Sequence, residues 1–549
     1  MRRAVIALAA ARLAAAARPN FLFILVDDAD VELGSTSASA MPALSSRVVA
    51  AGVNLTAAHV TSPICCPSRT SLFSGRYPHN LGDDTLGWCG NFSLQREDSL
   101  LVALGNAGYA VGQAGKWYNE ETEAQSFCEP GYVPAWKDGS ARGNASDSFL
   151  LCQEGVYYGN PYNENGVITK RGHAPADYMT AVIGNRSLAF LRNATAGALP
   201  WVNFVAFQAP HLPATPAPWH ADAPIAARAP RTNAWNKGWA DKHFIVDNGI
   251  DKPMSAGLIN GSDTLHAQRL RSLLSVDDFV REAVDLLEEV GTLDNTFIIF
   301  TSDHGVSAQP RPPACLARAR ARAARPHRRP PSVPARAPIS PRPPQYHLGQ
   351  WGLWCEKAMP YNHDTRVPLY IRGPGIPAGT ASGALVAMNV DLGPTLLELA
   401  GAPDAWPSGT ARRDGRSLAA LLRAPAAPPA GWRDRMLIEF VGWVTPDEWL
   451  SPAQFQLTPS ADAGLINGAS NRWTALLVAN ATARTLVADW RPPSVDGRAA
   501  TNWTEAYDLA ADPESLVNIA VKGRAPAARI DAMRAEMWDV AYCVGAACP

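Results

Sequence analysis

The chain has 549 residues, which exceeds one average domain and is enough to bury a large core. Hydrophobic residues make up 47% of it and charged residues 18%, the values of an ordinary globular enzyme. The net charge of −1 argues against a nucleic-acid partner.

The first residues are typical of a signal peptide. Met1, Arg2 and Arg3 form a basic start before the small and apolar residues 4–17, and we expect cleavage near Ala17. No later run reaches the roughly 18–20 apolar residues that span a bilayer, so no transmembrane segment is expected. Eight Asn-x-Ser/Thr acceptor sequences favour a secretory route: Asn54, Asn91, Asn144, Asn185, Asn193, Asn260, Asn480 and Asn502. We therefore expect a soluble protein that is secreted, attached to the cell wall or extracellular, or lysosomal.

Short apolar runs predict buried strands that end in polar side chains. Residues 20–26 form such a run, and Asp27, Asp28 and Asp30 follow it directly. Three neighbouring carboxylates repel each other unless a cation lies between them; the alternative is a solvated loop with capping aspartates. The other runs, residues 109–114, 201–207 and 296–301, precede Lys116, His211, Asp303 and His304.

Helical patterns such as residues 270–290 lie between these strands, and this alternation predicts an α/β fold with an open, mostly parallel sheet flanked by helices. Ligands of such sheets bind beyond the carboxyl ends of the strands, so the polar side chains named above should converge on one site.

A smaller domain is expected after the α/β part. A helix at residues 392–400 is followed by a linker at 424–431, after which three strand patterns alternate as in an antiparallel sheet. These patterns cover residues 436–443, 473–478 and 485–490, and a helix is predicted at 531–540. We divide the chain into residues 18–430, the catalytic domain, and residues 431–549, a smaller α+β domain.

The stretch from Cys65 to Arg69 is unusual. Adjacent cysteines cannot easily bridge each other, and Pro67 fixes φ as at the first position of a helix, which would close at Gly75. Cys65 would then lie just ahead of a helix N-terminus, where free N–H groups favour an anion. The alternative is a disulfide or a buried thiol near a surface turn.

Cysteine pairing is partly readable from the spacing. Cys543 and Cys548 are close enough to close a small terminal loop in an oxidising compartment. The pairing of Cys89, Cys128, Cys152 and Cys355 stays open.

The stretch Cys65–Arg76 resembles the signature of the sulfatase family, in which the first cysteine is oxidised to formylglycine. Asp27-Asp28, Gly115-Lys116, the Ala-Pro-His sequence ending at His211, and residues 301–305 follow the order of the family's other motifs. The resemblance implies an alkaline-phosphatase-like large domain. Within the family, the chain is similar to members that act on the 6-sulfate of N-acetylglucosamine and to the arylsulfatases of algae.

The resemblance also implies the site residues. One calcium ion would be bound by Asp27, Asp28, Asp303 and His304, with the modified Cys65 facing it. The negative charge of the sulfate would be offset by Arg69, Lys116 and Lys357. The leaving oxygen would be protonated by His211 or Lys357. One hydroxyl of hydrated formylglycine would attack the sulfur, and the second would expel sulfate. Maturation would require the formylglycine-generating enzyme.

Two positions depart from the family pattern. Tyr118 stands where many members have a histidine that could act as base in the elimination step, so the base is open. His79 is a possible replacement, with a structural role in its turn as the alternative. Lys357 has the family's spacing to Val367 in a divergent context; its alternative is a solvated surface lysine.

Residues 306–345 do not fit the pattern. This stretch of 40 residues has nine arginines, eleven prolines and no acidic residue, and without it the net charge would change from −1 to −10. Its first two residues and its last are those that an intron's donor and acceptor sequences would encode. We interpret it as an intron retained in frame; the alternative is a basic loop that binds acidic polysaccharide.

The preferred function is a sulfatase that acts on sulfated carbohydrate, most specifically on the 6-sulfate of N-acetylglucosamine. An arylsulfatase of broad specificity would act on aryl sulfates instead. A related phospho- or phosphono-ester hydrolase would more often carry Thr or Ser as nucleophile and a second metal. A silent glycan-binding homologue would keep Cys65 as a thiol.

Overall fold

The computed structural model describes residues 18–81, 97–119, 127–137, 145–153, 155–225, 228–238, 241–243, 253–305, 348–353, 357–441, 471–480, 483–490 and 503–549. The expected signal peptide, the segment 306–345, the acceptor residues Asn91, Asn144 and Asn502, and Cys89 and Cys355 lie outside these ranges.

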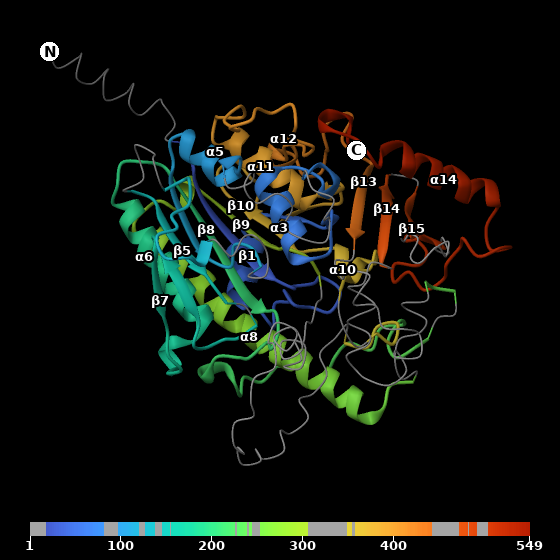
Figure 1. Cartoon of the computed structure of the whole chain (residues 1–549), viewed down its shortest axis with the longest axis horizontal. Helices are drawn as coiled ribbons and strands as arrows, with labels where there is room; N and C mark the ends of the chain where they lie inside the picture. Colours follow the sequence, from blue (N-terminus) through green and yellow to red (C-terminus); the bar gives the residue numbers. More distant parts are fainter. Residues whose placement is uncertain are drawn as a thin grey trace, which may run out of the picture.

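A ten-stranded sheet forms the centre of the larger part of the molecule (Figure 1). In spatial order its strands are β11 (Thr380–Ser382), β2 (Val53–Leu55), β10 (Leu369–Arg372), β9 (Thr296–Ser302), β1 (Asn20–Asp27), β8 (Trp201–Pro210), β4 (Ala110–Gly115), β5 (Asp147–Leu151), β6 (Pro161–Glu164) and β7 (Val167–Lys170). The five strands from β9 to β5 run parallel, and antiparallel pairs lie on both sides of them. The parallel sheet predicted from the sequence thus corresponds to the middle of the observed ten-stranded sheet.

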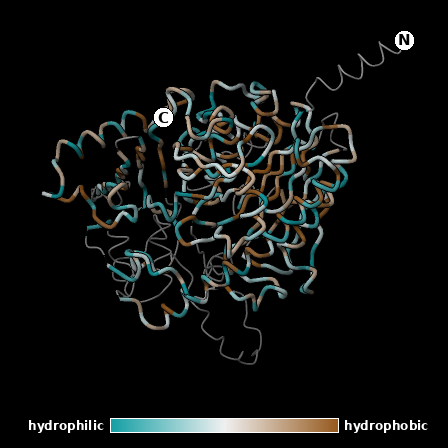
Figure 2. The backbone as a smooth tube through the Cα atoms, turned by 180° about the vertical axis from the view of Figure 1, so that it is seen from behind, coloured by the Kyte–Doolittle hydropathy of each residue, from teal (hydrophilic) through white to brown (hydrophobic). Residues whose placement is uncertain are grey.

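Helices cover both faces of this sheet, which explains why its central strands are buried almost throughout and mostly apolar. On β1, Phe21, Phe23 and Leu25 pack into one core and Leu22, Ile24 and Val26 into another. The first core includes residues of α3 (Cys65–Ser74), α5 (Leu100–Asn106), α11 (Met388–Leu399) and α12 (Ala419–Arg423); the second includes residues of α2 (Pro42–Leu44), α6 (Met179–Thr195) and α8 (Ala256–Glu289). Figure 2 shows apolar stretches gathered inside this part of the molecule.

The smaller sheet is antiparallel, as predicted. It consists of β13 (Arg435–Val441), β14 (Arg472–Ala479), β15 (Arg484–Trp490) and β16 (Trp503–Asp508), and α14 (Ala527–Val540) packs on one face. Its other face shares a core with Ile64, Trp351 and Tyr361 of the larger part. The two parts are therefore joined by buried apolar side chains.

Short elements complete the described fold. They are the two-stranded pair β3 (Ala58–His59) and β12 (Val386–Ala387), the helix α10 (Asn362–Thr365), the short π-helix η1 (Ser45–Val49), and the 3₁₀ helices η2 (Pro78–Asn80), η5 (Pro175–Asp177), η6 (Pro218–His220), η7 (Leu293–Asn295) and η9 (Gly545–Ala547).

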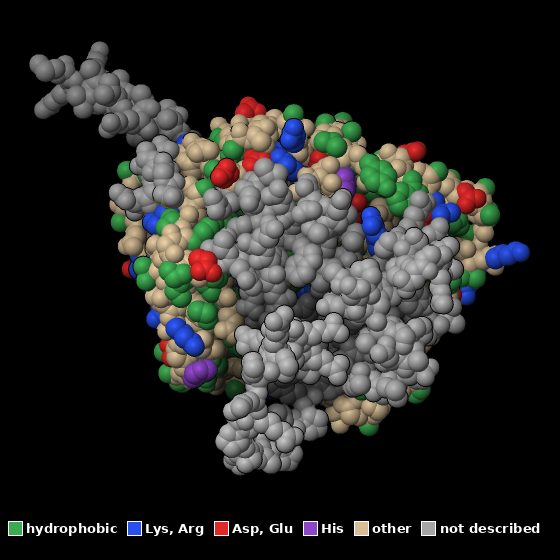
Figure 3. All heavy atoms as spheres, viewed as in Figure 1, with side chains coloured by type: hydrophobic (Ala, Val, Ile, Leu, Met, Phe, Trp, Pro, Cys, Tyr) green, Lys and Arg blue, Asp and Glu red, His purple; other side chains and the backbone are tan. Residues whose placement is uncertain are grey.

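The predicted fold class is confirmed, although several boundaries move. Helix α8 begins at Ala256 rather than at residue 270, because Ser255 caps it by accepting a hydrogen bond from the N–H of Leu258. Helix α11 begins four residues earlier than predicted, at Met388. Among the described residues no helix has the length and apolarity needed to cross a bilayer. On the face shown in Figure 3, Lys and Arg side chains lie among Asp and Glu side chains over the coloured part of the surface.

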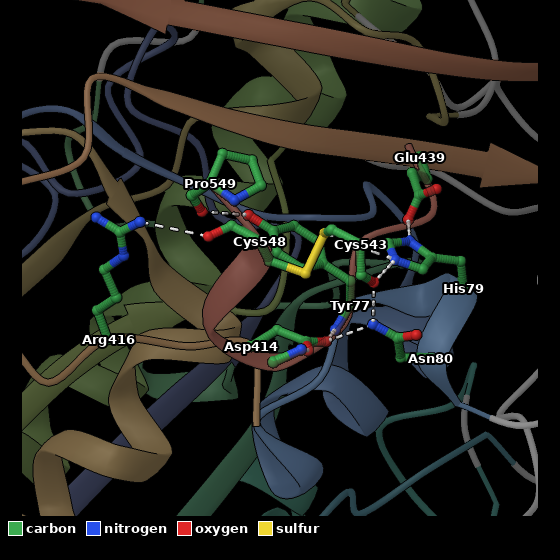
Figure 4. Close-up of a disulfide and its surroundings, with 10 residues drawn as sticks. Tyr77, His79, Asn80, Asp414, Arg416, Glu439, Cys543, Cys548 and Pro549 are labelled. Atoms are coloured by element: carbon green, nitrogen blue, oxygen red, sulfur yellow. Dashed lines mark hydrogen bonds and ion pairs between the residues drawn. A yellow bond between two sulfur atoms is a disulfide. The ribbon is translucent and has the colours of Figure 1, made fainter. Parts of the chain in front are cut away.

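The loop closed by Cys543 and Cys548 is docked on the turn that follows α3 (Figure 4). These two cysteines pair as predicted, and Cys128 pairs with Cys152. The Asp414 carboxylate accepts hydrogen bonds from the N–H groups of Tyr77 and Gly545. The turn after α3, which ends the cysteine-containing motif, is therefore where the end of the described chain is attached.

His79 is the charged part of this anchor. Its Nδ1 lies 2.7 Å from Oε2 of Glu439 on β13, and its Nε2 lies 2.9 Å from the carbonyl oxygen of Cys543. Burial alone would lower the pKa of His79, but the Glu439 carboxylate and the Cys543 carbonyl raise it to about 9. The imidazolium thus ties α3's trailing turn to the smaller sheet.

We predict that Gly115→Ala destabilises the protein strongly. Gly115 has a φ of 97°, and an added Cβ would collide with the carbonyl oxygen of Ala206 on the neighbouring strand. Gly375 is the matched control, since its φ is 77° but no atom lies within 4 Å of an added Cβ. By differential scanning calorimetry the melting temperature should fall much further in Gly115→Ala than in Gly375→Ala. Equal shifts would contradict the collision.

We predict that the contribution of His79 to stability depends on pH. Because its pKa is raised above the ordinary value near 6.5, the contribution is complete below about pH 6.5 and is lost as the pH rises through about 9. Urea unfolding should show His79→Gln less stable than the parent by about 2–3 kcal/mol at pH 6 and nearly equal to it at pH 10. A difference that stayed constant over this range would rule out the imidazolium as its source.

Candidate active site

The predicted site residues meet at the carboxyl ends of the central strands. Asp27 is the last residue of β1, and Asp303 and His304 follow the neighbouring β9. The pairing of Val26 with Ser302 places the two following carboxylates side by side, and the N–H of Asp28 donates to Oδ1 of Asp303 over 3.3 Å. All four side chains are buried.

Cys65 enters this group from helix α3. The helix begins at Cys65 itself, not at Pro67 as predicted, and it closes at Gly75 with a φ of 66°. Cys65 is a free, buried thiol, whereas Cys66 is disulfide-bonded. The Ser68 hydroxyl donates to the carbonyl oxygen of Asp303, which fixes the first turn of the helix against β9. The Cys65 sulfur faces the carboxylates and lies 3.7 Å from Asp27 Oδ1.

The carboxylates and the imidazole fit one cation. His304 Nε2 lies 3.3 Å from Asp28 Oδ1, 3.4 Å from Asp303 Oδ1 and 3.8 Å from Asp27 Oδ1. Neighbouring ligands at right angles around a calcium ion are about 3.3–3.7 Å apart, given bond lengths of about 2.3–2.6 Å. Asp28 Oδ2 is buried without a hydrogen bond among the described residues. Both observations fit the expected calcium ligands.

His304 is prepared to act as a neutral ligand. Its Nδ1 lies 3.0 Å from the carbonyl oxygen of Gly305, and this oxygen accepts a hydrogen bond if Nδ1 carries the proton. The lone pair of Nε2 then points toward the carboxylates. Burial, with a further contribution from Lys357, holds the pKa of His304 below its ordinary value.

Three cations compensate the three carboxylates. Arg69 Nε lies 2.8 Å from Asp303 Oδ2, Lys116 Nζ lies 2.5 Å from Asp27 Oδ2, and Lys357 Nζ lies 3.2 Å from Asp28 Oδ1. Burial alone would raise the pKa of Asp27, but Lys116 and the other cations hold it well below the usual range. Since these charges balance, a bound divalent cation would leave the site positive and suited to an anionic substrate.

Lys357 is buried, so the alternative of a solvated surface lysine does not hold. Its Nζ lies 2.9 Å from the Cys65 sulfur and 3.1 Å from His304 Nε2. Burial raises the pKa of the Cys65 thiol to about 12 despite the two neighbouring lysines, so the unmodified side chain stays a neutral thiol. An unmodified Cys65 is therefore a poor nucleophile.

His211 lies near Oδ2 of Asp28, whereas His304 and Lys357 lie near Oδ1. Its Nε2 is 4.0 Å from Asp28 Oδ2, and its Nδ1 is 2.9 Å from the Leu212 carbonyl oxygen. The Tyr157 hydroxyl donates to the His211 carbonyl oxygen over 2.6 Å. Tyr157 was not identified from the sequence, because no motif surrounds it.

Asp30 does not join the cation group with Asp27 and Asp28. Asp28 has a φ of 75°, and this left-handed turn leads the chain away from the other carboxylates. Asp30 Oδ2 instead lies 3.2 Å from the Arg269 guanidinium, which also donates to the Asp28 carbonyl oxygen. Arg269 was missed as well, since the helix that carries it was expected to begin after it.

His79 has no contact with the Cys65 group, and both of its ring nitrogens are occupied by Glu439 and Cys543. The structural alternative for His79 is thus the one that its surroundings favour.

Comparison with known proteins identifies relatives over most of the chain. Residues 19–402 match the family model described as Sulfatase. N-acetylglucosamine-6-sulfatase of Homo sapiens is 32% identical over 517 residues, which cover 92% of this chain and 81% of that protein. An arylsulfatase of Volvox carteri is 30% identical over 601 residues, covering 100% of this chain and 79% of the relative. A solved structure in complex with its substrate D-glucosamine-2-N,6-O-disulfate superposes with a TM-score of 0.64 at 19% identity, covering 95% of this chain and 97% of that one.

We predict that calcium stabilises the protein through Asp28 and not through Asp30. With calcium at about 100 times its dissociation constant, stability should rise by about 2.7 kcal/mol over a chelator-treated sample. The resulting shift in melting temperature should be lost in Asp28→Asn. Asp30→Asn should lower stability, because Arg269 loses its partner, and yet keep the calcium-dependent shift. Loss of the shift in both variants, or in neither, would refute the assignment.

Proposed function

Since this chain belongs to the sulfatase family and is a sulfuric ester hydrolase, we propose that it removes the 6-sulfate of N-acetylglucosamine in sulfated glycans. The observation that carries the proposal is the convergence of Cys65, three carboxylates and three cations on one buried site. The alignment with the human N-acetylglucosamine-6-sulfatase supports the substrate. An arylsulfatase activity is the second candidate, because the Volvox relative aligns over the whole chain.

The proposal includes two groups that the chain would acquire. Calcium, held by Asp27, Asp28, Asp303 and His304, would polarise the sulfate oxygens. Formylglycine at Cys65 would supply a hydroxyl as nucleophile and a second hydroxyl for the release of sulfate, which serine and cysteine lack.

Arg69, Lys116 and Lys357 then offset the negative charge of the sulfate group. All three are fixed by carboxylates before the substrate enters, so little reorganisation is needed when charge develops in the transition state.

His211 is the residue best placed to protonate the leaving oxygen. Its Nδ1 is bonded to the Leu212 carbonyl oxygen, so Nε2 is the atom that can hold or release a proton toward the site. Lys357 is less suited to this task, since its Nζ lies against the Cys65 sulfur, on the side of the nucleophile.

We further propose that the protein follows the secretory route and meets the formylglycine-generating enzyme there. The signal-like start and the eight acceptor sequences support this route. Several acceptor asparagines, including Asn185, Asn193 and Asn260, are exposed in the structure and so are open to glycosylation.

The activity is tested with three substrates: N-acetylglucosamine 6-sulfate, an aryl sulfate and an aryl phosphonate monoester. We predict that sulfate is released from the sugar with the highest kcat/KM, and that Cys65→Ala lowers this value at least about 1,000-fold because the nucleophile is lost. A preference for the aryl sulfate would support the second candidate. A preference for the phosphonate would overturn the proposal.

The same preparation is digested with trypsin after reduction and removal of glycans. The mass of the peptide of residues 48–69 is then measured by mass spectrometry. Formylglycine at position 65 is the expected result in a secretory host that contains the modifying enzyme. An unmodified thiol combined with no sulfate release would point to a silent glycan-binding homologue.

A further inference from the structure

The segment that carries Lys357 is held by the smaller sheet. Lys357, Ala358 and Met359 are completely buried, and Ala358 has a φ of 78°, a left-handed conformation that is uncommon outside glycine. Such a conformation persists only where its surroundings fix it. The contacts of Ala358 are therefore informative about how Lys357 reaches its place.

Two donors fix the Ala358 carbonyl group. Asn471 Nδ2 lies 3.2 Å from this oxygen, and Trp473 Nε1 lies 3.0 Å from it. Both residues belong to the smaller part of the molecule, Trp473 on β14 and Asn471 directly before it. In turn, Trp490 Nε1 on β15 donates to Asn471 Oδ1 over 3.2 Å, which sets the orientation of the amide. The side chains of all three residues are buried.

A second contact holds the far end of the segment. The Tyr361 hydroxyl donates to Oε2 of Glu505 on β16 over 2.9 Å. Glu505 is itself fully buried and also accepts from the hydroxyl of Tyr507. The segment from Lys357 to Tyr361 is thus attached at both ends to the smaller sheet, although Lys357 itself faces the larger one.

We infer that Asn471 is a positioning residue for the reaction, acting through Ala358 on Lys357. A lysine has four side-chain torsions, so the place of its Nζ, 2.9 Å from the Cys65 sulfur, depends on a firmly held backbone. A displacement of about 1 Å at a catalytic group can cost about 100-fold in rate. The inference depends on the proposed function, in which Lys357 meets the sulfate group.

Asn471→Ala is compared with Asn518→Ala. Asn518 is a matched control, because it is a buried asparagine of the same smaller part. The described hydrogen bonds of its side chain go to the main chain of Asp241, Thr504, Ala506 and Ala520 and not to the Lys357 segment. Both variants should lower the melting temperature. Only Asn471→Ala should lower kcat, by about 10- to 100-fold, and raise KM, when it is assayed well below its melting temperature.

Two further variants separate positioning from general stability. Asn471→Asp keeps the shape but cannot donate to the Ala358 carbonyl, so it should lose as much kcat as Asn471→Ala. In a Lys357→Met background, Asn471→Ala should have no additional effect on kcat, since the group it positions is gone. Multiplied losses in the double variant would overturn the inference.

Affinity for inorganic sulfate, measured by calorimetry, is a readout that needs no turnover. Asn471→Ala and Lys357→Met should weaken sulfate binding to a similar degree, and Asn518→Ala should not. If the parent protein binds sulfate but hydrolyses no substrate, the proposed function fails while this comparison still decides the inference. Equal sulfate affinity in Asn471→Ala and Asn518→Ala overturns the inference, whereas the proposed function is decided by hydrolysis of the three substrates.

Discussion

Three carboxylates that are shielded from water must be neutralised within a small volume, because burying an unpaired charge costs several kcal/mol. Asp27, Asp28 and Asp303 come from two neighbouring strands, and their partners Lys116, Lys357 and Arg69 come from three other segments. Neither sheet alone supplies this arrangement. The ten-stranded sheet brings the carboxylates together, and the smaller sheet holds one of the three cations in place.

The part of the site that follows directly from the sequence is the part that lies on strands. Asp27 ends a buried strand, and three other buried strands are followed directly by Lys116, His211 and Asp303. The carboxyl ends of parallel strands lie at one edge of a sheet. Strand β16 and the strands β5 to β7, at one end of the large sheet, were not predicted, because their mixed polar sequences lack a clear alternation. Strands β1, β4, β8 and β9 were found because each contains a run of mostly apolar residues.

The parts that could not be predicted depend on single backbone angles and on distant contacts. From the sequence, Asp30 could be a third carboxylate ligand of the cation. The left-handed turn at Asp28 excludes it, and no pattern in the sequence predicts that turn. Lys357 has neighbours that fit neither a strand nor a helix, so its burial could not be read from periodicity. The contact of its neighbour Ala358 with Asn471 joins residues 113 positions apart, which local patterns cannot reveal.

The pairing of Val26 with Ser302 has a consequence for how such a chain can change over time. Side chains alternate between the two faces of a strand, so the gain or loss of one residue in β1 or β9 would send a carboxylate to the opposite face. Substitutions can accumulate one at a time, but a change of length in these two strands would remove the site in a single step. Insertions and deletions should therefore survive in the surface loops and be eliminated from the strands that lead into the carboxylates.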